Sequence, residues 1–134
     1  SPPELVEEKK AEKVQEAVAE ERKELTEVYK MIGTDDPTLI REYLLNGRLK
    51  FEYSDFTFKL SFDGKEHSLF LGDINELERL SDLVDQVGRF AQLAEGLAGE
   101  SEELENSYSA LCDFLADLQV KYSNVQRVQG VKEE

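Results

Sequence analysis

The sequence predicts an α+β fold in which a three-stranded antiparallel meander is flanked by helices. Two observations support this prediction. Residues 49–71 alternate between apolar and polar side chains with a period of two, which is typical of a sheet with one dry face and one wet face. The segments on both sides carry apolar residues at spacings of three and four, which indicates amphipathic helices. The predicted order is a long N-terminal helix, a short helix, the meander and a C-terminal antiparallel helical hairpin.

This order divides the 134 residues into three parts. Residues 1–33 form the N-terminal helix, residues 34–122 form a small α+β domain, and residues 123–134 form a flexible polar tail.

The first helix is predicted over residues 3–32, with Pro2 and Pro3 suited to its first turn and Gly33 to its end. Its apolar positions follow a heptad-like spacing that Glu21 interrupts. Two interpretations remain open: a coiled coil through which the chain forms a homo- or hetero-dimer, or a single amphipathic helix packed on its own domain. The stripe consists of Ala11, Val14, Val18, Leu25, Val28 and Ile32.

The short helix is predicted to follow at once. Asp36 and Pro37 suit its N-cap and its first position, and Asn46-Gly47 suits its end.

The meander is predicted to contain two turns of two residues each, Ser54-Asp55 and Asp63-Gly64. Asp-Gly between two alternating runs is a strong hairpin signal, because a type I′ turn needs positive φ at both central residues. The second turn would pair Phe62 with Lys65, Leu60 with His67, Phe58 with Leu69 and Phe56 with Leu71. The first turn would pair Tyr53 with Phe56, Phe51 with Phe58 and Leu49 with Leu60. The apolar residues of these pairs would then share one face, which the helices must cover.

The helical hairpin is predicted from a capping-box-like start, Asp73 with Glu76, to about residue 122. Gly99 is the expected end of its first helix, and Gly88 is expected to allow a close approach by a neighbouring element. The second helix is expected over residues 102–122, on an unbroken apolar series from Leu104 to Tyr122.

The chain is strongly acidic, with 16 Lys plus Arg against 30 Asp plus Glu and a net charge of −14. Residues 73–122 hold 12 acidic and 3 basic residues, so the predicted hairpin carries −9 of that total. Such a balance argues against nucleic acid and anionic membranes as ligands and favours basic protein partners. No apolar run is long enough to span a membrane. The single cysteine, Cys112, indicates an intracellular, reducing compartment.

No pattern for catalysis, cofactor binding or metal binding stands out. His67 and Cys112 are the only residues of their types, too few for a structural zinc site, and Cys112 falls beside an apolar helix seam. Nucleotide-binding loops, an EF-hand loop and the G-x-S-x-G pattern are all missing from the sequence. The sequence therefore predicts a protein that is not an enzyme and needs no cofactor.

The predicted function is a protein–protein interaction module, a scaffold or adaptor subunit, that binds its partner through helical seams and an acidic surface. The alternative is a small acidic chaperone that holds a client protein, for example by strand addition to the sheet edge. Phe70 lies on the wet face of the sheet, where either an exposed partner contact or cover by another part of the chain would explain it. The candidate partner-binding residues are Glu100, Glu102, Glu103, Glu105, Phe70, Val18 and Leu25.

Overall fold

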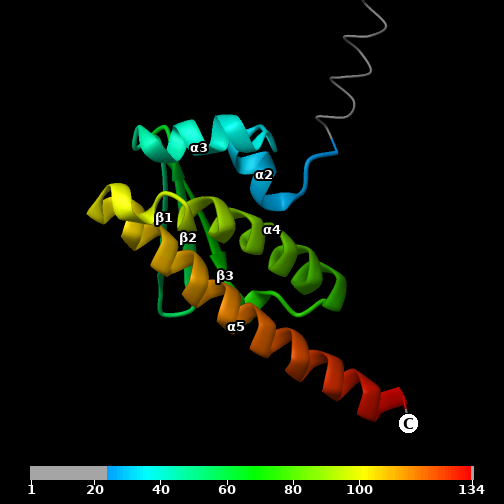
Figure 1. Cartoon of the computed structure of the whole chain (residues 1–134). Helices are drawn as coiled ribbons and strands as arrows, with labels where there is room; N and C mark the ends of the chain where they lie inside the picture. Colours follow the sequence, from blue (N-terminus) through cyan, green and yellow to red (C-terminus); the bar gives the residue numbers. More distant parts are fainter. Residues whose placement is uncertain (1–23, 134) are drawn as a thin grey trace, which may run out of the picture.

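The computed structural model describes residues 24–133, which form four α-helices and a three-stranded antiparallel sheet, so the α+β class is confirmed (Figure 1). In chain order the elements are α2 (Glu27–Ile32), α3 (Pro37–Leu45), β1 (Leu49–Ser54), β2 (Thr57–Phe62), β3 (Lys65–Phe70), the 3₁₀ turn η1 (Leu71–Asp73), α4 (Leu77–Glu95), the 3₁₀ turn η2 (Ala98–Glu100) and α5 (Glu102–Glu133).

The predicted long N-terminal helix is not continuous up to residue 32. Thr26 is extended, with φ −75° and ψ 169°, and α2 starts only after it. Val28 and Tyr29 are buried in the core, so the packing of this short helix sets its direction. The rest of the predicted helix, including Val18, lies outside the described residues.

The ends of the two short helices follow the sequence signals. Gly33 closes α2 with φ 86°, a left-handed conformation that favours glycine. Asp36 is the N-cap of α3, and its carboxylate accepts a hydrogen bond of 2.9 Å from the Thr38 N–H. The helix ends at Leu45 with Asn46 as its C-cap.

The second hairpin has the predicted register. Phe62 pairs with Lys65, and Asp63 and Gly64 have φ values of 50° and 79°, as a type I′ turn requires. The predicted pairs of Leu60 with His67 and of Phe58 with Leu69 are also present.

The strand pairing in the first hairpin is shifted by two residues from the prediction, because the turn lies one residue later in the chain. The central turn residues are Asp55 and Phe56, with φ values of 51° and 60°, instead of Ser54-Asp55. A shift of two keeps every side chain on its predicted face, because the side-chain period of a strand is also two. Phe56 is the exception, since it leaves the strand and becomes 59% exposed. The observed partners are Leu49 with Phe62, Phe51 with Leu60 and Tyr53 with Phe58.

The helical hairpin also differs at its ends. Its first helix starts at Leu77 instead of Asp73, which lies in η1, and it ends at Glu95 before Gly96. A Cβ on Gly88 would meet nothing within 4 Å, so the predicted close approach at this glycine is wrong. The second helix does not end near residue 122, because α5 continues to Glu133 through the predicted tail.

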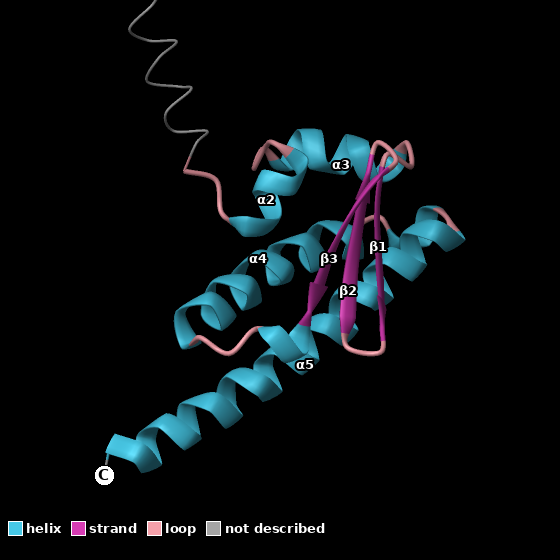
Figure 2. Ribbon diagram, turned by 180° about the vertical axis from the view of Figure 1, so that it is seen from behind, coloured by secondary structure: helices cyan, strands magenta, loops and turns pink. Residues whose placement is uncertain are grey.

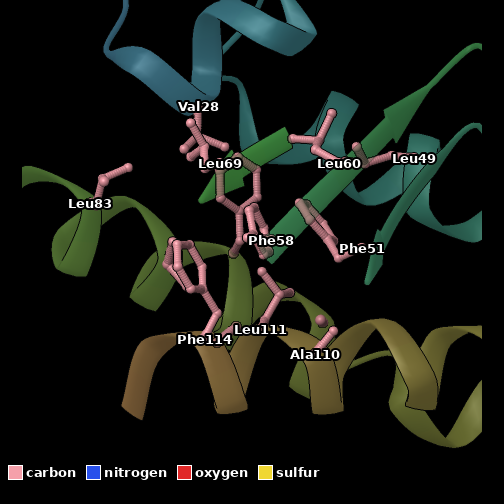
Figure 3. Close-up of a cluster of buried hydrophobic side chains, with 14 of the residues drawn as sticks. Val28, Leu49, Phe51, Phe58, Leu60, Leu69, Leu83, Ala110, Leu111 and Phe114 are labelled. Atoms are coloured by element: carbon pink, nitrogen blue, oxygen red, sulfur yellow. The ribbon is translucent and has the colours of Figure 1, made fainter. Parts of the chain in front are cut away.

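The core lies between the dry face of the sheet and the helices. Phe58 of β2 stacks on Phe114 of α5, with ring centroids 4.4 Å apart, and Phe51 of β1 stacks on Phe58 at 5.6 Å. Figure 3 shows these rings between the strands and α5, with Val28 of α2 beside Leu69 of β3. Both views place the helices on one side of the sheet, and Figure 2 shows its opposite face, which no described element covers.

Candidate partner-binding surfaces

Gln86 fixes α2 to α4 inside the core. Its side chain is only 2% exposed, and its Oε1 accepts a hydrogen bond of 2.7 Å from the Val28 N–H. Its Nε2 donates to the Asp82 carbonyl at 3.1 Å. Sequence reasoning missed this residue, although a polar side chain within the apolar stripe of α4 was the available signal. A second link on the surface joins Arg79 to Glu27 at 2.6 Å.

The outer edge of β1 is sealed by α5. The Phe51 N–H, which points away from β2, donates to the Oγ of the buried Ser107 at 3.2 Å. The Tyr53 hydroxyl donates to Asp117 at 2.5 Å. Burial, together with this carboxylate, raises the pKa of Tyr53 well above its usual range. This edge is therefore closed to another strand.

The predicted acidic residues gather at one end of the α4–α5 hairpin, which we call the acidic tip. It consists of Glu100, Glu102, Glu103 and Glu105, all of them exposed. Ser101 caps the start of α5 by accepting the Leu104 N–H at 3.1 Å, and carboxylates in a first turn are favoured by the helix dipole. Only one ion pair reaches the tip among the described residues, from Lys50 to Glu103 at 3.6 Å.

The predicted apolar contact residues Phe70 and Leu25 lie in different environments. Phe70 is 47% exposed at the end of β3, on the open face of the sheet. Phe56, which was expected in the core, lies at the same end of the sheet, where its carbonyl accepts the Leu71 N–H. Leu25 is half-buried and packs against the core, so most of its apolar surface is satisfied within the domain.

The far end of α5 provides an apolar surface that the sequence did not indicate. Between Glu102 and Gly130, Leu118 is the last fully buried residue of this helix. We call residues 119–133 the α5 overhang. Figure 1 shows the overhang running past α4 and the sheet. Val120 is 59% exposed and Val128 is 51% exposed. A groove of about 540 Å³ lies where the overhang leaves the domain, lined by Asn75, Lys121, Asn124, Val125, Val128 and Gln129.

The residues with catalytic or metal-binding chemistry are dispersed. Cys112 is a half-buried free thiol on α5, and His67 is half-buried on β3. Within residues 24–133, no three His, Cys, Asp or Glu side chains are grouped to hold a metal ion. No helix in that range is long and apolar enough to cross a membrane.

Comparison of the chain with protein-family models, with curated proteins and with solved structures finds no match.

Proposed function

We propose that this protein is a protein–protein interaction module, a scaffold or adaptor subunit that binds its partner through the continuation of α5. The α5 overhang is the observation that carries the proposal. Isolated helices of this length are marginal in water, and most helices in proteins are stabilised by packing on an apolar face. The overhang presents Val125 and Val128 beside a groove, an arrangement that suits a second helix.

The position of the groove supports a helix as the occupant. α4 packs along α5, and the loop that precedes α4 contributes Asn75 to the groove. A partner helix on the overhang would therefore follow α4 end to end, and would extend the packing that α4 already makes with α5.

The acidic tip supports a second contact, with a basic surface of the partner. It lies at the opposite end of α5 from the overhang, so one long helix would present both surfaces. Exposed charges contribute more to the rate and specificity of association than to its affinity. We therefore assign the larger share of the binding energy to the overhang.

The test compares three forms of the full chain: wild type, Val128→Asp, and Gln126→Asp as the matched control. Gln126 is exposed and points about 160° around the helix from Val128, so both variants add the same charge to the same turns. Proteins retained by each immobilised form are identified, and the partner that distinguishes the forms is purified and titrated. We expect wild type and Gln126→Asp to bind it equally and Val128→Asp to bind at least about tenfold more weakly. Equal affinity of all three forms would refute the overhang as the site.

The client-holding chaperone is the second candidate, and the exposed aromatic rings of Phe56 and Phe70 favour it. Large apolar side chains gathered at one end of an open sheet are typical of binding surfaces. This function predicts that the protein prevents the aggregation of an unfolded model substrate, such as reduced insulin, at a stoichiometric ratio. It also predicts that Phe56→Ser with Phe70→Ser loses this protection. Unchanged aggregation in the presence of the wild-type chain would exclude it.

A further inference from the structure

The two edges of the sheet differ in how their backbone groups are satisfied. β1 and β3 are both edge strands, since the strand order is β1-β2-β3. The β1 edge faces α5, and Ser107 accepts one of its outward N–H groups. No described residue makes a comparable hydrogen bond to the outward groups of β3.

The register identifies those outward groups. In a two-residue hairpin the residues that flank the turn exchange hydrogen bonds, and this pattern alternates along the strands. Lys65, His67 and Leu69 therefore bond to β2. Glu66, Ser68 and Phe70 direct both their N–H and their C=O away from it. Three consecutive outward positions, without a proline or a bulge, form a regular template for another strand.

The side chains at these positions define what the added strand would contact. Glu66, Ser68 and Phe70 are all exposed on the open face of the sheet, which is turned toward the viewer in Figure 2. Phe70 lies at one end of the series, and a Cβ on the neighbouring Gly72 would overlap its ring. Glu66 lies at the other end, and its nearest cation is Lys59 at 4.0 Å.

We propose that the β3 edge binds an extended segment of another protein as a fourth, antiparallel strand. Cross-strand neighbours on one face of a sheet contact each other directly, so the segment needs an apolar residue opposite Phe70 and a cation opposite Glu66. In the antiparallel direction it reads, from N to C, apolar, any, small polar, any, basic. The net charge of −14 favours the same basic segment at longer range. This site is separate from the α5 overhang and does not depend on it.

Random 12-residue peptides displayed on phage are the probe. The library is selected on the full chain, and the enriched peptides are then synthesised and titrated by fluorescence anisotropy. We expect enriched sequences with the apolar-x-x-x-basic spacing. Ser68→Pro should weaken their binding at least about tenfold, because proline removes one outward N–H and obstructs the added strand. The β2–β3 hydrogen bonds stay intact, since the Ser68 N–H takes no part in them. Ser68→Thr, the matched control, should bind as wild type does.

A charge reversal tests the predicted register. Glu66→Lys should make peptides with a basic last position bind more weakly than peptides with an acidic residue there, which inverts the wild-type order. Circular dichroism checks that each variant is folded.

Three results would overturn the proposal. The selected peptides could bind Ser68→Pro and wild type equally, or the charge preference could remain unchanged in Glu66→Lys. Alternatively, light scattering could show wild-type dimers that Ser68→Pro dissociates, in which case a second copy of the chain occupies the edge. If Val128→Asp lost partner binding but still bound the peptides, the α5 overhang and the β3 edge would be two independent binding sites.

Discussion

Replacing Gln86 by leucine removes the polar link between α2 and α4 at nearly constant side-chain volume. Gln86 is 2% exposed and Val28 is fully buried, so no water can replace the lost acceptor without opening the structure. A buried N–H left without a partner costs about 1–3 kcal/mol. Loss of the hydrogen bond from Gln86 Nε2 to the Asp82 carbonyl adds little to this free-energy cost, because that carbonyl still accepts a hydrogen bond within α4. The expected loss of about 1–3 kcal/mol corresponds to an opening of α2 that is roughly 5- to 150-fold more frequent.

Two measurements check this magnitude. Urea denaturation gives the change in the free energy of unfolding, and amide hydrogen exchange gives the protection of Val28 and the rest of α2. Gln92→Leu on the exposed side of α4 is the control and should change stability by no more than about 0.5 kcal/mol. If Gln86→Leu matched this control in both measurements, the hydrogen bond would not hold α2 in place.

Four further predictions concern the sheet, the hairpin and pH. Phe56→Gly should stabilise the protein by about 0.5–1 kcal/mol in urea denaturation, because glycine adopts φ 60° without steric cost; a loss of stability would contradict the assigned turn. Gly88→Ala should stabilise it by up to about 1 kcal/mol, since its Cβ meets open space; destabilisation would reveal a clash there. Leu118→Asp should unfold the domain, as seen by circular dichroism, because it buries a charge in a fully covered site; a folded variant would mean that this seam is an interface. Tyr53 has a raised pKa, so the folded protein keeps a proton that the unfolded chain releases above about pH 10, and stability falls as pH rises. Tyr53→Phe should flatten this fall by at most about 1.4 kcal/mol per pH unit, and an identical pH dependence would exclude Tyr53 as its source.

The sequence was most informative where local chemistry decides the structure. Asp63-Gly64 set the β2–β3 register, and Asp36-Pro37 set the start of α3. The period-two pattern identified the dry face of the sheet, because the face to which a strand side chain points depends only on whether its position is odd or even. It could not distinguish registers that differ by two, so the first turn was misplaced and Phe56 was assigned to the core. No glycine marked that turn, which uses Asp55 and Phe56 at positive φ.

The start of α2 and the end of α5 depend on tertiary contacts, which a local sequence pattern does not reveal. α2 is separate from the segment before it because Val28 packs in the core and bonds to Gln86, a residue 58 positions away. α5 continues past Tyr122 through a segment whose polar composition indicated a tail. Val120 and Val128 are exposed because α4 and the sheet end before them, and this depends on the tertiary arrangement. The acidic tip was the part of the candidate site that could be predicted, since a run of glutamates at a helix start is a local feature.

Cross-linking in cells tests whether Val128 lies in a protein-binding surface. A photoreactive phenylalanine analogue is placed at position 128 of the full chain, or at position 126 as the control, and the chain is illuminated in living cells. We expect a discrete protein adduct from position 128 that the control position does not give. No adduct from position 128, or the same adducts from both positions, would contradict it.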